Sequence, residues 1–280
     1  MISDEILAFS HIPKTAGTTL NYILKRHFAH RHLLVEYRKP PPVYTSKDLD
    51  FDLKINPAIR SIAGHTLKPY VDFGRDLTWF TFLRNPVDRF LSHYQHQYRS
   101  VEKFRIPLRD WMRTYERQNW MTRMIAGTED VEAAKQILAN FAFVGLMERF
   151  DESLLLLKHL AIPDLDIAYK PKNVSARMAT SFDDHLSEVI EQNSLDIELY
   201  EYAENRLQSQ LDSLGEQEIV TAFDGPSIRD RINIALCDAY RHAIYRPVVW
   251  LDRRRSVPNP VLTAPTLVSM VPRILSRNDV

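Results

Sequence analysis

The sequence predicts an α/β fold in which a central, mostly parallel sheet is flanked by helices. Three observations support this fold class. Runs of apolar, β-branched and aromatic residues are short enough to be buried strands. Helical patterns alternate with these runs, as expected of parallel strands that are covered on both faces. The chain has 280 residues, of which 45% are hydrophobic, and this is ample for a large core.

The expected elements follow in order along the chain. Strand-like or short apolar runs occupy residues 6–9, 33–35, 59–65, 77–83 and 141–146. Helical patterns occupy residues 18–30, 86–99, 107–117, 119–126, 130–140, 148–160, 193–212 and 227–245. We expect residues 1–215 to form the α/β domain and residues 216–280 a helical extension of unassigned role with a proline-containing tail. After Pro247 this tail shows no core pattern.

Charge and cysteine content limit the classes of function. The formal net charge is zero, so no long-range field favours nucleic acid or an anionic membrane. The single cysteine, Cys237, excludes an intrachain disulfide and fits a reducing compartment; we expect a buried apolar residue. The sequence has no basic-then-apolar signal and no apolar run that could span a bilayer. It therefore predicts a cytoplasmic protein without a transmembrane segment.

The segment from His11 to Thr19 predicts an anion site. A strand at residues 6–9 ends in a loop that contains Lys14, and a helix pattern opens at Thr18. In such a loop, backbone amides and the helix dipole converge on an anion. Lys14 adds a charge, and Thr18 and Thr19 add hydroxyl donors. A plain strand–helix turn with a solvated lysine explains this segment alone equally well.

A second segment predicts a further anion site. Arg84 directly follows the strand at residues 77–83, with Asn85 suited to the N-cap and Pro86 to the first turn of the next helix. Ser92 lies two turns into that helix. An arginine fork with a hydroxyl suits a phosphate. Two anion sites at the ends of parallel strands suit a nucleotide with phosphates at both ends of its ribose.

Both segments resemble the sulfotransferases, whose fold is similar to that of P-loop nucleotide-binding proteins. Residues 11–19 resemble the 5′-phosphosulfate loop and residues 84–94 the 3′-phosphate motif, with the same spacing from arginine to serine. The closer resemblance is to the branch of heparan and uronyl 2-O-sulfotransferases and their bacterial relatives, sulfotransferase family 2. Weaker similarities at residues 63–74, 119–127 and 143–148 extend the resemblance over roughly residues 6–210.

The resemblance implies a reaction and a set of site residues. The donor would be 3′-phosphoadenosine 5′-phosphosulfate (PAPS), used without a metal, and the acceptor a hydroxyl, expected on a carbohydrate. Lys14 would contact the bridging oxygen, and Arg84 and Ser92 would hold the 3′-phosphate. The backbone amides that would hold the 5′ group are those of Thr15, Ala16, Gly17, Thr18 and Thr19. Weaker candidates for the donor site lie in a basic loop and are Lys172, Asn173 and Arg177.

His65 is the candidate catalytic base. It follows Gly64 at a predicted strand end, and an imidazole titrates near neutral pH. It aligns with the glycine–histidine element of the uronyl 2-O-sulfotransferases, whose second histidine, two residues earlier, is replaced by Ala63. The alternative is a structural histidine that caps a turn.

Other polar residues are weighed against simpler roles. His11 is expected to pack beneath the loop, outside the catalytic set. His93 and His96 have a spacing that could bind metal, although a solvated or core-edge pair is favoured. Two further groups are open to either interpretation. The first is a basic group that forms either a solvated helix end or a contact surface, and its members are Lys25, Arg26, His27, His30, Arg31 and His32. The second either lines an acceptor cleft or forms the polar face of a helix, and its members are Asn119, Thr122 and Arg123.

Two rival functions remain at this point. Strand–loop–helix phosphate sites also serve nucleotide and small-molecule kinases, but the usual order of glycine, lysine and serine or threonine is missing. A non-catalytic nucleotide-binding protein that has kept the fold is the second rival.

Overall fold

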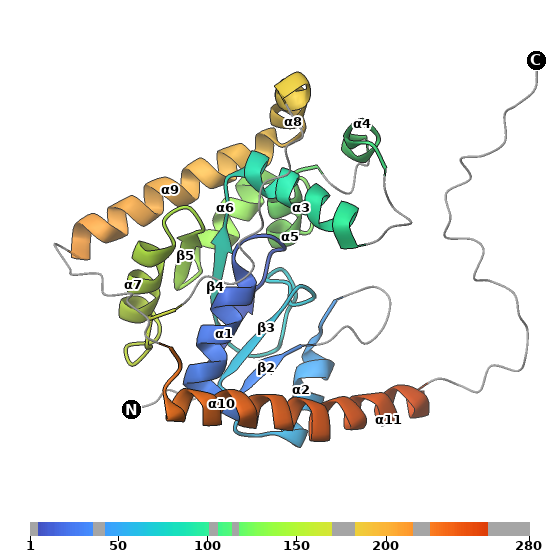
Figure 1. Cartoon of the computed structure of the whole chain (residues 1–280), viewed down its shortest axis with the longest axis vertical. Coiled ribbons are helices and arrows are strands. Elements are labelled where there is room, and N and C mark those ends of the chain that lie inside the picture. Colours follow the sequence, from blue (N-terminus) through green and yellow to red (C-terminus); the bar gives the residue numbers. More distant parts are fainter. Residues whose placement is uncertain are drawn as a thin grey trace, which may run out of the picture.

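Five parallel strands form the central sheet of the computed structural model, in the order β2-β3-β1-β4-β5 (Figure 1). The structure describes residues 5–35, 43–100, 106–113, 118–169, 183–214 and 225–256. The strands are β1 (Ile6–Ser10), β2 (His32–Leu34), β3 (Ser61–Gly64), β4 (Leu77–Leu83) and β5 (Phe143–Leu146). Helices connect and flank them, which confirms the predicted α/β fold.

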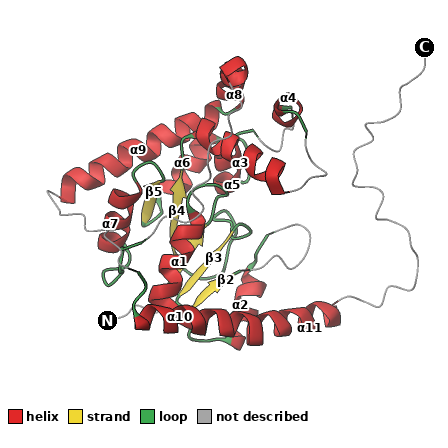
Figure 2. Ribbon diagram, in the orientation of Figure 1, coloured by secondary structure: helices red, strands yellow, loops and turns green. Residues whose placement is uncertain are grey.

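The helices lie around the sheet as Figure 2 shows. In chain order they are α1 (Gly17–Phe28), α2 (Ser46–Ile55), α3 (Pro86–Ser100), α4 (Leu108–Met112), α5 (Trp120–Ala126), α6 (Val131–Ala139), α7 (Phe150–Leu160), α8 (Leu186–Gln192), α9 (Ser194–Leu214), α10 (Ile228–Ala239) and α11 (Arg246–Ser256). The helix expected over residues 107–117 is short, because α4 ends at Met112 and residues 114–117 lie outside the described ranges. Within those ranges, no helix is long and apolar enough to cross a lipid bilayer.

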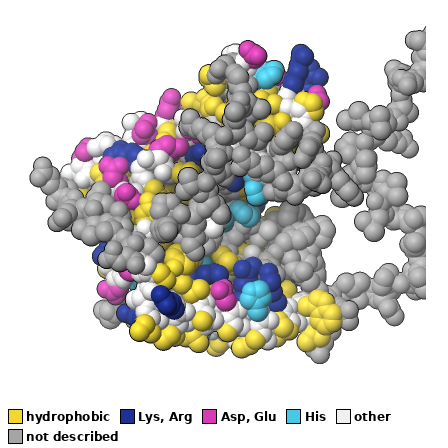
Figure 3. Space-filling view, viewed as in Figure 1, with side chains coloured by type: hydrophobic (Ala, Val, Ile, Leu, Met, Phe, Trp, Pro, Cys, Tyr) yellow, Lys and Arg dark blue, Asp and Glu magenta, His cyan; other side chains and the backbone are white. Residues whose placement is uncertain are grey.

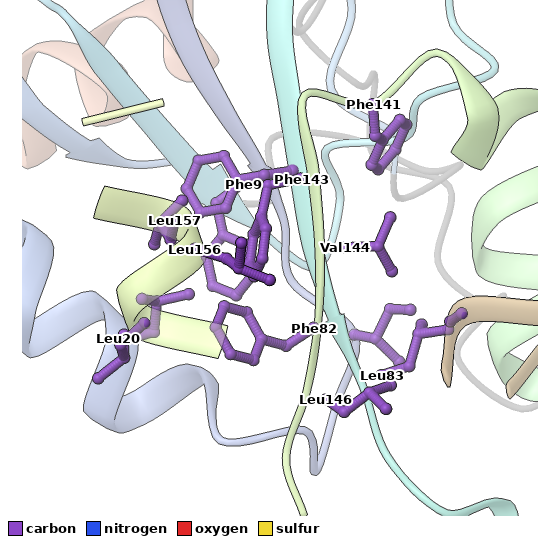
Figure 4. Close-up of a cluster of buried hydrophobic side chains, with 14 of the residues drawn as sticks. Phe9, Leu20, Phe82, Leu83, Phe141, Phe143, Val144, Leu146, Leu156 and Leu157 are labelled. Carbon is purple, nitrogen blue, oxygen red and sulfur yellow. The ribbon is translucent and has the colours of Figure 1, made fainter. Parts of the chain in front are cut away.

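The main core lies on both faces of β4 and β5. Neighbouring residues of a strand point to opposite faces, so Phe143 and Val144 of β5 lie on different sides of the sheet (Figure 4). Phe143 packs edge-on against Phe82 of β4, with ring centroids 5.6 Å apart. Because both faces of the sheet are covered, these strands are rich in apolar, β-branched and aromatic residues, as their sequences indicated.

A second core lies beneath β2 and β3 and includes a helix that the sequence analysis did not predict. Thr45 and Asp48 form a capping box that begins α2. The buried carboxylate of Asp52 accepts a hydrogen bond of 2.6 Å from Tyr44 and a longer one of 3.4 Å from Tyr245. Tyr245 comes from the C-terminal helices, so residues far apart in sequence share this core.

The C-terminal helices correct the expectation for the chain after Pro247. The expected helix at residues 227–245 is α10 followed by a π-helical segment (Tyr240–Tyr245), and helix α11 then continues to Ser256. A proline clashes with the carbonyl four residues earlier, and the wider π turn just before Pro247 accommodates that clash. Figure 3 shows hydrophobic side chains over these helices, and the exposed ones are Ile228, Ile232, Leu236, Ile244, Trp250 and Leu251.

Helix α10 covers the end of α1, where the sequence indicated a basic group. Lys25 pairs with Asp238 at 2.7 Å, and buried Arg26 pairs with Asp230 at 3.3 Å and also with Asp166. His32 is buried in β2, where Nδ1 lies 3.0 Å from Ser61 Oγ. Neither a solvated helix end nor an open contact surface describes Lys25, Arg26 and His32, because they serve the packing of α10 and the sheet.

Candidate active site

Three candidate residues follow the carboxyl ends of three adjacent strands. Strand β1 lies between β3 and β4, and Ser10 is in register with both Gly64 and Thr81. The phosphate loop (residues 11–16) leaves β1, His65 follows β3, and Arg84 follows β4. The chain first places β2 and β3 on one side of β1 and then crosses to β4 on the other side. Such a switch in strand order is where open α/β sheets bind ligands.

The phosphate loop is held in a strained conformation. Lys14 and Ala16 have φ angles of 73° and 65°, in the left-handed region that side chains disfavour. The hydroxyl of Thr15 is buried and donates a 2.9 Å hydrogen bond to the carbonyl of Ile12, which closes the turn. Backbone strain of this kind clusters at ligand sites, where the surrounding structure maintains it. The Thr15 hydroxyl is thus committed to the loop itself.

Helix α1 begins without an internal cap. Ala16 offers no side-chain acceptor, and the first turn contains no acidic residue. The amides of Thr19 and Leu20 donate to the carbonyl of Ala16 at 3.0 and 3.2 Å. In the part of the chain that the structure describes, the amides of Gly17 and Thr18 have no main-chain acceptor. These two amides and the helix dipole are therefore available to an anion, whereas the Thr19 amide is already engaged.

Other helices show that this open start is not general in the chain. Capping boxes begin α2 and α10, and the carboxylate of Asp130 caps α6. The predicted cap of α3 is confirmed, because Asn85 accepts hydrogen bonds from the amides of Val87 and Asp88 at 3.1 and 3.2 Å.

Gly17 makes room for the ring of His11. A Cβ atom at Gly17 would lie 1.7 Å from His11 Nε2, far inside any permitted contact. The His11 ring stacks on Phe9, with ring centroids 5.2 Å apart. Burial, and then the neighbouring His65, lower the pKa of His11 to about 3, so its ring is neutral at pH 7. The sequence predicted that His11 packs beneath the loop, but it did not indicate that this packing requires a glycine at position 17.

Two cations, Lys14 in the loop and Arg84 after β4, lie within electrostatic reach of each other. The guanidinium of Arg84 donates from Nη1 to the carbonyl of Lys14 at 3.3 Å. Partial burial lowers the pKa of Lys14, and the nearby charge of Arg84 lowers it further. The two positive charges repel each other, and a bound anion offsets that repulsion.

One polar face of helix α3 lies within electrostatic reach of the phosphate loop. Ser92 and His96 are four residues apart and hence on the same face. Partial burial lowers the pKa of His96, and the charge of Lys14 contributes to this shift, so His96 lies within electrostatic reach of the loop. The sequence analysis did not connect His96 with the phosphate loop, although its position four residues after Ser92 could have indicated this.

His93 has different surroundings from His96. It is buried edge-on against Trp111 and Trp120, with ring centroids 5.4 and 5.3 Å away. The described residues contain no group of three or more side chains suited to hold a metal ion.

The geometry of His65 fixes which ring nitrogen carries the proton. Its Nδ1 lies 2.7 Å from the carbonyl oxygen of His11. A carbonyl only accepts hydrogen bonds, so Nδ1 carries the hydrogen and the neutral ring has its lone pair on Nε2. The surrounding protein and the charge of Lys68 lower the pKa of His65, while the bond to His11 opposes this shift. A neutral, oriented imidazole at pH 7 can accept a proton at Nε2.

Two of the residues considered for an acceptor cleft have structural roles. The side-chain oxygen of Asn119 accepts a 3.1 Å hydrogen bond from the amide of Leu195. Thr122 is buried, and its hydroxyl donates to Asp196 at 2.9 Å. Both residues thus join α5 to α9. The remaining candidates for the donor site lie outside the described residues and are Lys172, Asn173 and Arg177.

Comparison with known proteins identifies the family of the chain. A search of curated proteins found no match to the chain. Among sequence models of protein families, the one described as the sulfotransferase family matches residues 1–203. The match spans every strand of the sheet, the phosphate loop, His65 and the Arg84–Ser92 segment. Because it covers well over half of the 280 residues, the chain belongs to the sulfotransferase family.

Proposed function

We propose that the chain transfers the sulfuryl group of PAPS to an acceptor hydroxyl, on a carbohydrate. One observation carries the proposal. Lys14, Arg84 and His65 follow three adjacent strand ends, beside a helix N-terminus whose first amides are open. Two cations and two free amides supply charge and donors for a doubly anionic nucleotide, and a neutral imidazole supplies a base.

The donor site offers separate partners for the two ends of the nucleotide. The amides of Gly17 and Thr18 and the ammonium of Lys14 would hold the 5′-phosphosulfate. Arg84 and Ser92 would hold the 3′-phosphate, the group that distinguishes PAPS from ATP. His96, on the same face of α3 as Ser92 and within electrostatic reach of Lys14, would add a hydrogen-bond donor. The residues present thus fit the donor that the family typically uses.

Chemistry at the acceptor requires a base and a stabilised leaving group. His65 accepts the hydroxyl proton at Nε2 as the acceptor oxygen forms its bond to sulfur. The bond between sulfur and the bridging oxygen breaks, and Lys14 stabilises the negative charge on the departing phosphate. Fixed amides and cations contribute mainly by positioning and charge stabilisation, as in phosphoryl transfer.

Transfer of label from PAPS to a panel of glycans tests the proposal. Wild type should transfer label, and His65→Ala should bind 3′-phosphoadenosine 5′-phosphate (PAP) normally but lose transfer. His159→Ala, which changes an exposed histidine in the last turn of α7, is the matched control and should retain the rate. An unchanged rate in His65→Ala would remove that residue from the mechanism.

Calorimetry separates the proposal from the kinase alternative. The sulfotransferase should bind PAP more tightly than ADP, with or without magnesium. Tighter binding of magnesium-ADP would favour a kinase, and tight PAP binding without transfer would favour a non-catalytic protein.

A further inference from the structure

The C-terminal helices carry exposed apolar side chains that take no part in the candidate active site. Helices α10 and α11, joined by the π-helical segment, run as one continuous helix along an edge of the molecule (Figure 1). This helix lies outside residues 1–203, which the sulfotransferase family model matches. Its exposed large apolar side chains form an apolar stripe whose members are Ile228, Ile232, Leu236, Ile244, Trp250 and Leu251.

The apolar stripe lies on the side of the helix that faces away from the protein. Ile228, Ile232 and Leu236 are four residues apart and therefore share one face of α10. Tyr245 and Val249 are buried in the second core and mark the opposite face. Ile228 is 78% exposed and Ile232 is 54% exposed. Exposed apolar patches with a polar rim mark interaction sites.

The π-helical segment keeps the outward face continuous along the helix. Exposed residues recur every four positions at Ala235, Ala239, Ala243, Pro247 and Leu251. In a regular α-helix such a repeat would rotate around the axis, and the wider turn of the π-helical segment counteracts this rotation. From Ile228 to Leu251 the helix rises about 35 Å at about 1.5 Å per residue. A straight stripe of this length fits a flat surface better than a short groove.

Positive charge flanks the apolar stripe. The continuous helix contains seven arginines and three aspartates between residues 228 and 256. Two of the aspartates, Asp230 and Asp238, pair with cations of α1 at 3.3 and 2.7 Å and so do not balance the arginines. Figure 3 shows cationic and histidine side chains next to the hydrophobic ones along this edge. The exposed arginines of the described side chains in this helix are Arg229, Arg231 and Arg246. The zero net charge of the whole chain hides this local excess.

An apolar stripe flanked by cations matches the surface of a bilayer that contains anionic lipids. Interfacial helices bury apolar side chains at the boundary of headgroups and acyl chains, while arginines stay beside the lipid phosphates. Trp250 suits the same boundary, where tryptophan is enriched. Two copies of the chain packed stripe to stripe would instead bring arginines next to arginines, which is unfavourable. We propose that the apolar stripe lies in the surface of an anionic membrane and holds the protein there peripherally.

Membrane contact at this helix leaves the candidate active site accessible. Helix α1 begins at the phosphate loop and ends where Lys25 pairs with Asp238 of α10. Its twelve residues place the two ends about 18 Å apart. The membrane surface and the strand-end site are therefore at opposite ends of α1. The inference concerns where the protein lies and does not depend on the proposed function.

Sedimentation of the full-length protein with lipid vesicles tests the proposal. The vesicles contain either equal parts of phosphatidylglycerol and phosphatidylcholine or phosphatidylcholine alone. Wild type should sediment with the anionic vesicles, and salt should weaken this binding because it screens the charges. The double variant Ile232→Ser, Leu236→Ser should bind at least about tenfold more weakly, because two apolar side chains no longer leave water. Ile190→Ser, at an exposed apolar residue of α8, is the matched control and should bind like wild type.

Charge variants test the anionic character of the surface. Arg229→Gln and Arg231→Gln should each weaken binding to anionic vesicles about fivefold, the factor that one basic residue near such a surface contributes. Arg109→Gln, at an exposed arginine of α4, is the matched control. Equal binding of wild type to both kinds of vesicle would contradict the role given to the arginines.

Trp250 reports whether the stripe itself enters the lipid surface. All four tryptophans lie within the described residues, and Trp250, at 50%, is the exposed one. Anionic vesicles should shift the fluorescence of wild type to shorter wavelength. Trp250→Phe should lose most of this shift and still sediment with the vesicles. A shift of the same size in Trp250→Phe would place the contact elsewhere on the protein.

The remaining outcomes also decide the matter. Absence of vesicle binding, or binding that the double variant leaves unchanged, overturns the proposal. A dimer that the double variant dissociates, seen by sedimentation equilibrium without vesicle binding, would make this face an interface between copies. Because the changed side chains are exposed, the melting temperature and the transfer rate to a water-soluble acceptor should equal those of wild type. Failure of wild-type transfer would refute the proposed function and leave the vesicle result standing.

Discussion

Replacing Gly17 by alanine tests the packing beneath the phosphate loop. The new Cβ would lie 1.7 Å from Nε2 and 2.1 Å from Cδ2 of His11, so the ring must move by well over an ångström. The ring cannot move freely, because it also lies against Phe9 and, with centroids 4.0 Å apart, against His65. Overpacking of this kind costs about 1–3 kcal/mol of unfolding free energy. At this chain length, the melting temperature should fall by about 2–4 °C for each kcal/mol.

A double-mutant cycle isolates the clash from other effects. In the His11→Ala background no ring occupies this space, so Gly17→Ala should cost almost nothing there. Thr18→Ala, one residue along on the exposed side of α1, controls for changes at the helix start. Thermal and chemical unfolding give stability, and calorimetry gives PAP affinity, which should also fall in Gly17→Ala. An equal cost of Gly17→Ala in both backgrounds would refute the argument that the ring demands a glycine.

Four further predictions follow from the same contacts. Lys14→Ala should lower the transfer rate more than PAP affinity, as measured by single-turnover kinetics beside calorimetry, because its charge matters most on the departing phosphate. Arg84→Ala should weaken PAP binding about 10- to 100-fold with little change for nucleotides that lack a 3′-phosphate; equal losses would contradict its role. Asp196→Ala removes the acceptor for the amides of Met121 and Thr122, at 2.9 and 2.7 Å, and should cost about 1–3 kcal/mol for each amide left unpaired, as measured by urea unfolding. Because the pKa of His65 is lowered from 6.5, the transfer rate should stay level as pH falls to that value and decline only below it.

Local signals in the sequence were sufficient for the elements that form the site. Apolar strands followed by turn residues predicted β1, β3 and β4, and Asn85 with Pro86 predicted the start of α3. Once parallel strands are adjacent, their carboxyl ends meet at one edge, so Lys14, His65 and Arg84 come together without further information.

Features that depend on contacts distant in sequence could not be predicted in this way. Helix α2 was missed even though Thr45 and Asp48 form a capping box, because its apolar face is defined by the second core. The basic group at the end of α1 appeared to be surface, since its partner carboxylates are more than 100 residues away. Helix α11 was missed because a proline such as Pro247 usually ends a helix. The preceding π turn accommodates the clash between the proline ring and the carbonyl four residues earlier.

The same limit applies inside the site. The sequence analysis assigned Gly17 to the phosphate loop because of its backbone amide. The structure shows in addition that a side chain at this position would clash with the ring of His11. The spacing of His93 and His96 indicated a pair, but His93 is buried against two tryptophans and His96 lies within electrostatic reach of Lys14. Lys68 carried no motif, and only the fold brings its ammonium group to the thioether sulfur of Met124 in α5.

A crystal structure of the chain with PAP tests the central claim most directly. We expect the 5′-phosphate at the amides of Gly17 and Thr18 with Lys14, and the 3′-phosphate at Arg84 and Ser92 of the same nucleotide. A complex in which either group of residues leaves its phosphate uncontacted would contradict the account.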